Sequence, residues 1–344
     1  MAGLYIHIPF CASRCIYCGF FSSTSLLSRD AYVDALCHEM EIRKDYLHES
    51  VETVYLGGGT PSQLSFNSLQ QISYYIRKIY FSDGSLPTEF TIECNPDDVT
   101  TEFCDNLKSL PVNRVSMGAQ TFSDKRLQFL HRRHSAEEVT IAVQRLRSAG
   151  IKNISIDLMF GFPGETLNEW EEDLRMALAL NPQHISAYSL MYEKGTPLYN
   201  MLQKGEIDEI EEELSRKMYD RLVDMLTSAG YEHYEISNFA RPGYRSKHNS
   251  SYWNETPYLG IGAAAHSYNG TSRQWNISNI KDYIDNISNN ILPSEIEELD
   301  LPTRYDDMIT TALRTCDGIN LIKMRKEYGE KLYHYLLENS KKEI

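Results

Sequence analysis

Short apolar, β-branched runs alternate with helical patterns in this chain, and this alternation limits the possible folds more than any other feature. Helical spacing is clear in Ser28–Leu47, where Ser28 is a predicted N-cap. Repeated βα units predict an α/β fold with a parallel sheet, either an open doubly wound sheet or a curved partial (β/α)6 barrel. The predicted strands are Leu4–Ile8, Thr53–Leu56, Glu89–Glu93, Arg114–Met117, Ile154–Met159 and Ile185–Leu190.

The regular alternation ends before residue 231. The acidic run Glu206–Glu213 is predicted to open a long helix, because carboxylates in the first turns favour the helix dipole. The pattern is irregular from Tyr231, the acidic stretch around Pro293–Pro302 indicates a linker, and Thr303–Ile344 is mostly helical. We therefore expect a core over residues 1–230, an extension over 231–292, and a linker with a helical region over 293–344.

Charge and composition exclude several classes of protein. The 344 residues carry 34 basic and 48 acidic side chains, a net charge of −14, which disfavours non-specific binding to nucleic acid. No apolar run is long enough to span a bilayer, and the amino terminus lacks the pattern of a signal peptide. Seven cysteines without a framework of paired spacings predict a reducing, cytoplasmic location.

Polar and glycine residues follow the predicted strands at the point where each strand ends. Because the carboxyl ends of parallel strands meet at one edge, where α/β proteins keep their active sites, we expect one shared site. The residues concerned are Cys11, Gly57–Thr60, Glu93, Gln120, Asp157 and Gly161.

Three cysteines, Cys11, Cys15 and Cys18, lie in the loop after the first strand with the spacing C-x3-C-x2-C. An odd count argues against disulfides, and a structural zinc site normally has four ligands. An iron–sulfur cube held by three thiolates leaves one iron open to a small molecule. The remaining cysteines are isolated and are predicted to be ordinary core or surface residues: Cys37, Cys94, Cys104 and Cys316.

The motif C-x3-C-x-Y-C directly after a first strand resembles the radical S-adenosylmethionine superfamily. The resemblance implies a partial (β/α)6 barrel and a 4Fe-4S cluster on Cys11, Cys15 and Cys18. It also implies that S-adenosyl-L-methionine fills the open iron site in place of a fourth protein ligand. Relatives often continue further into a C-terminal helical domain, so we expect this chain to stop inside that domain.

The same resemblance assigns a pocket for S-adenosylmethionine along the strand ends. In LGGGTPS the glycines let a ligand approach the backbone, and the stretch is not a phosphate loop because it lacks G-x-x-x-x-G-K-[ST]. Carboxylates suit ribose hydroxyls or an amino group, and arginine suits a carboxylate. The residues implied are Tyr5, Tyr17, Gly58, Gly59, Thr60, Glu93, Gln120, Arg132 and Asp157.

The motifs are most similar to the coproporphyrinogen III dehydrogenase group, within which two functions compete. The decarboxylating branch carries a fourth cysteine two residues after the third and an amino-terminal arm. Here Phe20 takes the cysteine's place and only four residues precede Tyr5. The context CGFFSS instead resembles the haem chaperone branch, in which an acidic residue is usual at the position of Gly19.

KHNSSYW, Lys247–Trp253, contains H-N-x-x-Y-W, a motif that the resemblance links to haem binding. It implies that His248 binds haem iron, with His266 of YLGIGAAAHSY as the alternative; neutral imidazole is a common iron ligand. Arg241, Arg245 and Lys247 could pair with the haem propionates, or they could form a solvated basic loop.

The leading hypothesis is a haem chaperone that passes haem to an unidentified acceptor protein, which could be membrane-associated. The alternative is a radical enzyme that works through a 5′-deoxyadenosyl radical. It would be an oxygen-independent coproporphyrinogen III oxidase (dehydrogenase), or a methyl-transfer or cyclising relative.

Overall fold

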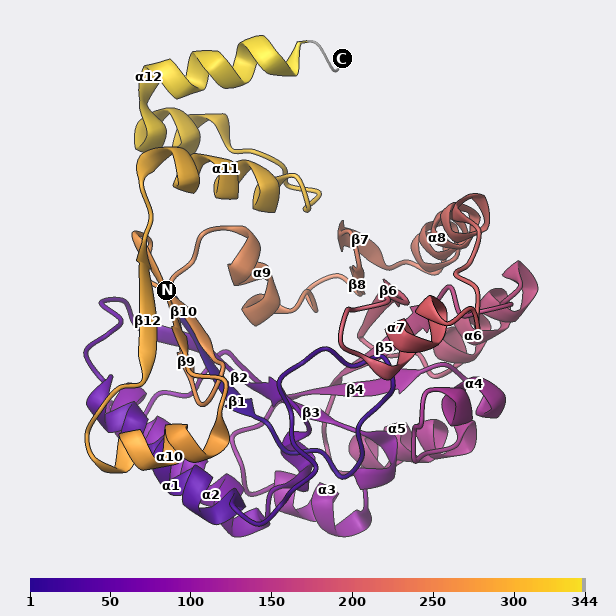
Figure 1. The fold of residues 1–344 in the computed structure, drawn as a ribbon, viewed down its shortest axis with the longest axis horizontal. Helices are drawn as coiled ribbons and strands as arrows, with labels where there is room; N and C mark the ends of the chain where they lie inside the picture. The colour runs from indigo at the N-terminus through magenta and orange to yellow at the C-terminus, as the bar shows by residue number, and fades with distance from the viewer. Residues whose placement is uncertain (342–344) are drawn as a thin grey trace.

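The computed structural model describes residues 1–341. Within them, one sheet of twelve strands has the order β12-β11-β10-β9-β1-β2-β3-β4-β5-β6-β8-β7. Figure 1 shows the helices of the first half wrapped around one side of this sheet, while α9 lies on the other side. No helix in the described part of the chain is long and apolar enough to cross a membrane.

The centre of the sheet confirms the predicted parallel series. Its strands are β1 (Ala2–Ile8), β2 (Val51–Gly58), β3 (Glu89–Cys94), β4 (Arg114–Gln120), β5 (Asn153–Phe160) and β6 (His184–Ser189). Each pairs in parallel with the next. The outer edges of β1 and β6 pair with β9 and β8, so the barrel is partial.

The helices between these strands cover the outer face. They are α1 (Arg29–Ile42), α2 (Phe66–Tyr80), α3 (Thr101–Leu107), α4 (Asp124–Phe129), α5 (Ala136–Ser148) and α6 (Leu167–Ala179), with 3-10 turns at Pro61–Gln63 and Pro96–Asp98. Side chains alternate between the two faces of a strand, so Leu4, Ile6 and Ile8 are buried in the main core under the helices. The alternate positions are polar and line the inner face, in a row formed by Tyr5, Tyr55, Thr91 and Arg114.

The region after α6 differs in part from its prediction. It contains α7 (Pro197–Gln203) and α8 (Glu212–Ser228). The helix begins at Glu212, so the prediction that Glu206 opens it is wrong. Ile207 and Ile210 pack against two different apolar clusters, which accounts for the non-helical approach to α8.

Short strands extend the sheet at both edges. β7 (Glu232–Glu235) and β8 (Asn238–Ala240) join beyond β6. On the other edge lie β9 (Tyr258–Ile261), β10 (His266–Tyr268), β11 (Ser272–Asn276) and β12 (Ser294–Glu298), while α10 (Ile280–Ser288) packs beside α1. A linker was predicted around Pro293–Pro302, and this is wrong for β12, which pairs antiparallel with β11. Its exposed acidic side chains suit an edge strand.

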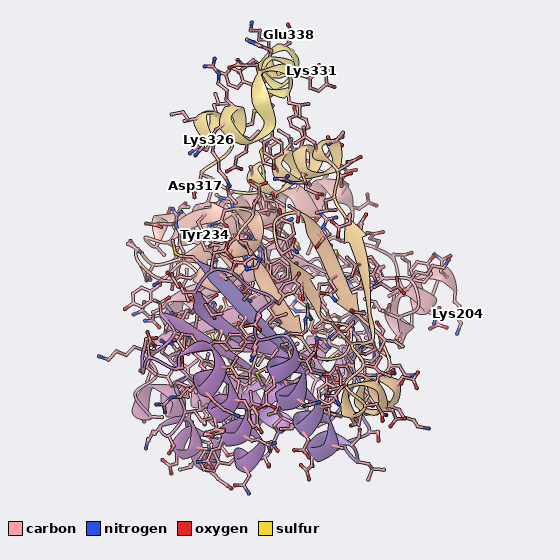
Figure 2. The ribbon with its side chains drawn as sticks, turned by 90° about the vertical axis from the view of Figure 1, so that its left-hand side faces the viewer. Lys204, Tyr234, Asp317, Lys326, Lys331 and Glu338 are labelled. Carbon is pink, nitrogen blue, oxygen red and sulfur yellow. The ribbon has the colours of Figure 1, made fainter. Side chains whose placement is uncertain are left out.

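The C-terminal region is mostly helical, as predicted, over its described residues. It consists of α11 (Leu301–Ala312) and α12 (Leu321–Ser340), and α12 bends at Gly329, whose φ is 81°. The two helices bury four residues between them, which form a small core separate from the main core: Tyr305, Met308, Met324 and Tyr328. Figures 1 and 2 show this pair of helices, here called the C-terminal hairpin, standing away from the helices of the barrel.

Candidate functional site

The cysteine loop follows the carboxyl end of β1. Its base is fixed by the Cys11 backbone N–H, which donates to the Ser23 carbonyl at 3.0 Å. His7 adds a second tie: its Nε2 donates to the Phe21 carbonyl at 2.9 Å, while its Nδ1 accepts from the Tyr5 hydroxyl at 2.9 Å. The loop is thereby held at the strand end, as the sequence predicts.

The loop thiols contact two of the predicted pocket residues. Thr60 Oγ1 donates to Cys11 Sγ at 3.5 Å, and Arg132 Nη1 donates to Cys15 Sγ at 3.5 Å. Asn95 links them, because it accepts from Arg132 at 2.7 Å and donates to Thr60 Oγ1 at 3.4 Å. The Arg132 Nε is buried and has no hydrogen-bond partner among the described residues. The loop therefore places donors beside its sulfur atoms.

These residues fit an iron–sulfur cube better than a single metal ion. All three loop cysteines are free and partly exposed, and burial raises the pKa of the Cys11 and Cys18 thiols. Within residues 1–341, no three His, Cys, Asp or Glu side chains converge closely enough to bind one ion. In a cube each thiolate binds a different iron, so its ligands need not converge in that way.

The remaining cysteines match their predicted plain roles. None of them forms a disulfide. Cys37, Cys94 and Cys104 are buried, and Cys316 is exposed.

The two predicted carboxylates lie on the inner face, Glu93 near the end of β3 and Asp157 in the second half of β5, with β4 between them. Glu93 accepts from the Tyr55 hydroxyl at 2.7 Å and from the Gly58 N–H at 3.0 Å, and burial raises its pKa to about 7. Asp157 accepts from the Ser116 hydroxyl at 3.3 Å, and burial raises its pKa. Both carboxylates are partly buried, so hydrogen bonds from a ligand to them would be less weakened by water than at the surface.

The glycine turn packs too closely against β1 and the residues after it to accommodate side chains. Gly58 has a φ of 104°, and a Cβ there would lie 2.3 Å from the His7 ring. A Cβ at Gly59 would lie 2.6 Å from the Ile8 carbonyl oxygen. A side chain at Gly58 would therefore displace the His7 ring, and one at Gly59 would displace the backbone that leads into the cysteine loop.

The other predicted pocket residues also gather here. Tyr17 packs against the small apolar cluster beneath the loop, and burial raises its pKa. Gln120 has a φ of 69°, and its side chain lies close to Gly118, whose carbonyl accepts from Arg132. Tyr5 reaches the loop through His7.

Sequence reasoning missed the residues that hold the pocket in place. They are His7, Tyr55, Asn95, Ser116 and Arg114. Arg114 is fully buried, and its Nε and Nη1 have no partner among the described residues. The available signal was the placement of polar residues at every second position of strands whose other positions are apolar.

The KHNSSYW segment forms helix α9 (Lys247–Trp253) on the inner face of the sheet. The backbone N–H groups of Lys247 and His248 each donate to the Glu89 carboxylate at 2.9 Å. Glu89 is the first residue of β3, so α9 lies at the amino ends of the strands, opposite the cysteine loop.

His248 is fully buried at this end of the partial barrel. Its Nδ1 is hydrogen-bonded to Thr53 Oγ1 at 2.9 Å and its Nε2 to the Tyr252 hydroxyl at 3.0 Å. The ring stacks on Tyr55 at a centroid distance of 5.2 Å, and burial lowers its pKa to about 3. Iron binding by His248 therefore stays a prediction. It requires that one of the two hydrogen bonds to the ring break first.

His266 lies in a more open environment. It begins β10, it is exposed, and it stacks on Trp275 with ring centroids 6.0 Å apart. No hydrogen bond to its ring occurs within residues 1–341.

The predicted propionate partners are partly engaged. Arg245 pairs with Glu232 at 2.8 Å, and Arg241 donates to Asn181 at 2.9 Å. The side chain of Lys247 is exposed. Among these three cations, Lys247 could therefore pair with a propionate without losing a side-chain contact seen within residues 1–341, whereas Arg241 and Arg245 could not.

The partial barrel and its three-cysteine loop define a radical S-adenosylmethionine protein. Residues 5–177 match the model of the Radical SAM superfamily. Coproporphyrinogen III oxidase (HemN) from Escherichia coli, described as a radical SAM enzyme, has the same fold. It superposes with a TM-score of 0.84 at 21% identity, covering 99% of this chain and 81% of that one. The superfamily match confirms the predicted cofactors, a 4Fe-4S cluster and S-adenosylmethionine.

The nearer sequence resemblance is to haem chaperones named HemW. The protein from Bacillus subtilis is 38% identical over 337 residues, covering 96% of this chain and 88% of that one. The Lactococcus lactis protein is 35% identical over 334 residues, covering 96% and 86%. The Escherichia coli protein is 36% identical over 270 residues, covering 76% and 69%. The chain belongs to the HemW family of the radical SAM superfamily.

Proposed function

We propose that the protein is a haem chaperone, which binds haem and transfers it to an acceptor protein. The observation that carries this proposal is the likeness to HemW relatives over 96% of the chain, a span that includes helix α9. Phe20 supports it, because the decarboxylating branch carries a fourth cysteine at this position. The Phe20 side chain is 70% exposed.

The cysteine loop is the proposed cluster site. Cys11, Cys15 and Cys18 would hold the 4Fe-4S cluster, and S-adenosylmethionine would occupy its open iron. Donors from Thr60 and Arg132 beside the thiols would stabilise their negative charge.

The residues around the loop would hold S-adenosylmethionine by different means. Glu93 and Asp157 would accept hydrogen bonds, Arg132 would offer donors, and the rest would shape the pocket. The shaping residues are Tyr5, Tyr17, Gly58, Gly59, Thr60 and Gln120.

For haem iron we propose His248 as the ligand, with His266 as the alternative. The motif around His248 favours it, whereas the exposed ring of His266 needs no hydrogen bond to break. The acceptor would be a protein, and the proposed location is the cytoplasm because the cysteines are free.

Two assays on one preparation would test the function. We expect anaerobically reconstituted protein to bind haem in a Soret titration and to pass it to an apo-haemoprotein. With reductant, S-adenosylmethionine and coproporphyrinogen it should release no carbon dioxide. Steady decarboxylation would instead establish the enzyme as the function.

A further inference from the structure

Tyr55, on β2, contacts both ends of the partial barrel. Its hydroxyl donates to Glu93 Oε1 at 2.7 Å, at the end that carries the cysteine loop. Its ring stacks on His248 of α9, with ring centroids 5.2 Å apart and ring planes inclined by 26°. Thr53, two residues earlier on the same face of β2, is hydrogen-bonded to His248 Nδ1 at 2.9 Å. One strand therefore connects the proposed pocket for S-adenosylmethionine with the buried histidine.

The neighbouring strand β3 also carries one residue for each end. Glu89 accepts from the backbone N–H groups of Lys247 and His248 at 2.9 Å and so fixes the start of α9. Glu93 lies four residues later on the same face of β3. Within residues 1–341, Glu93 makes no hydrogen bond to α9, so a change at Glu93 reaches that helix through Tyr55.

The contact between Tyr55 and Glu93 is tightly enclosed. A Cβ at Gly57 would lie 2.6 Å from Tyr55 Cε1 and 2.9 Å from the carboxyl carbon of Glu93, so a side chain there would push the two groups apart. On the neighbouring strand β1, Tyr5 packs beside Tyr55 with ring centroids 6.2 Å apart. Tyr55 is buried, and its hydroxyl and ring form one rigid group. Because closely packed groups cannot adjust independently, the motion of Glu93 and the stack on His248 are linked.

The unused acceptor sites of Glu93 set the direction of this link. A carboxylate has roughly four acceptor sites, and within residues 1–341 Glu93 uses one on each oxygen, for Tyr55 and for the Gly58 N–H. A ligand donor can therefore join these bonds without displacing the tyrosine. It would restrict the motion of the Glu93 side chain and favour its ionised form, which accepts from the Tyr55 hydroxyl more strongly. Both effects hold Tyr55, and with it His248, in place.

We propose that Tyr55 couples the two ends of the barrel, so that S-adenosylmethionine held at Glu93 keeps His248 and α9 in the closed position. The proposal rests on the function proposed above, which assigns Glu93 to S-adenosylmethionine and His248 to haem iron. Because iron binding requires His248 to open, the cofactor at one end would weaken haem binding at the other, and haem would weaken cofactor binding by the same factor. Loss of S-adenosylmethionine from its pocket then favours the open state of α9, which can bind haem.

Amide hydrogen exchange of Lys247–Trp253 measures the opening of α9 in the reconstituted full chain. At pH 7, saturating S-adenosylmethionine should slow this exchange about fivefold, the lower end of typical coupling between sites. Tyr55→Phe keeps the stacked ring and removes the hydroxyl, so the slowing should disappear. The matched control is Tyr283→Phe, because Tyr283 is also a buried tyrosine that donates to a buried glutamate, Glu39, at 2.6 Å. It should keep the wild-type slowing, whereas no slowing in the wild type, faster exchange, or equal slowing in Tyr55→Phe would overturn the proposal.

A second comparison needs neither the cofactor nor Tyr55→Phe. Burial raises the pKa of Glu93 to about 7, so at pH 8 Glu93→Gln replaces a charged acceptor of the Tyr55 hydroxyl with a neutral one. Exchange of α9 should then become severalfold faster without any ligand. Asp157→Asn removes the other pocket carboxylate, which is bonded to Ser116 rather than to Tyr55, and should leave the exchange unchanged. Equal exchange in these two variants would contradict the coupling.

The coupling and the proposed function fail in different ways. If Glu93→Gln binds S-adenosylmethionine as tightly as the wild type, the assignment of Glu93 to the cofactor fails, and the coupling fails with it. If Glu93→Gln weakens cofactor binding but α9 exchanges at the same rate with and without the cofactor, only the coupling fails. If the exchange results are as expected but the wild-type protein gives no Soret titration with haem, the coupling stands and the haem-binding function fails.

Discussion

The cysteine loop and His248, at the two ends of the partial barrel, differ in how far the protein satisfies their polar atoms. At the carboxyl ends, Cys11, Cys15 and Cys18 are partly exposed and the Arg132 Nε has no partner among residues 1–341. At the amino ends, both ring nitrogens of His248 are hydrogen-bonded in a fully buried position. The first end is prepared for a ligand, whereas the second is closed by the protein itself.

This difference distinguishes side chains that are free to bind a ligand from side chains that stabilise the fold. A site that awaits a ligand leaves donors and thiols without protein partners, at a cost in stability. A buried ring whose two nitrogens are both hydrogen-bonded, as in His248, adds to stability. If His248 does bind iron, it must leave a stabilising position first, so the free energy of opening is subtracted from its haem affinity.

The largest expected effect is loss of the cluster. Cys15→Ala should abolish stable iron loading, because the three thiolates act as one set of ligands. Iron content and visible absorption after anaerobic reconstitution are the measurements. Cys104→Ala, a buried cysteine outside the loop, is the control and should load normally. Full iron loading in Cys15→Ala would contradict the assignment.

The next effect concerns the closed end. His248→Ala removes two hydrogen bonds and a stacked ring, and should lower the free energy of unfolding by about 2–4 kcal/mol while iron loading is kept. The exposed His48 provides a control, since His48→Ala should be close to neutral. Chemical denaturation would measure both. The same variant should shift or erase the haem Soret band, and an unaltered band would move the ligand assignment to His266.

A pH titration sharpens the comparison further. Burial lowers the pKa of His248 to about 3, so between the unfolded value of 6.5 and about 3 only the unfolded chain protonates this ring. Its contribution is therefore complete above pH 6.5 and is lost as the pH falls. Relative to His248→Gln, wild-type stability should drop by about 2 kcal/mol from pH 6.5 to 5. A difference between the two proteins that does not change with pH would mean that the ring is solvated.

The sequence predicts which residues lie together at the open end because the signals for it are local. Each strand of the parallel series has an apolar face and ends in a recognisable turn, and the three cysteines lie within eight residues of one another. The pocket residues lie within or just after those strands, so the parallel arrangement alone places Glu93 and Asp157 on the same face, one strand apart.

The closed end could not be predicted in the same way. Glu89, which holds the start of α9, lies 159 residues from His248 in the sequence. The edge strands are short and polar, and the acidic residues of β12 resemble a linker. Neither the burial of His248 nor its stacking on Tyr55 has a local pattern, because both depend on contacts between distant segments.

The smallest effect tests the chemistry of the open end. Removing the Asp157 or Glu93 carboxylate leaves ligand donors without acceptors, so Asp157→Asn and Glu93→Gln should each weaken S-adenosylmethionine binding about tenfold while the cluster assembles. Burial raises the pKa of Glu93 to about 7, so the accepting carboxylate forms only as the pH rises through that value. Wild-type affinity should therefore increase between pH 6 and 8, and Glu93→Gln should flatten this profile, whereas Glu102→Gln, which changes an exposed side chain of α3, should reproduce the wild type. Isothermal titration calorimetry on reconstituted protein can measure all three profiles. If Glu93→Gln kept the wild-type pH profile, the carboxylate that titrates at the open end would have to be another one.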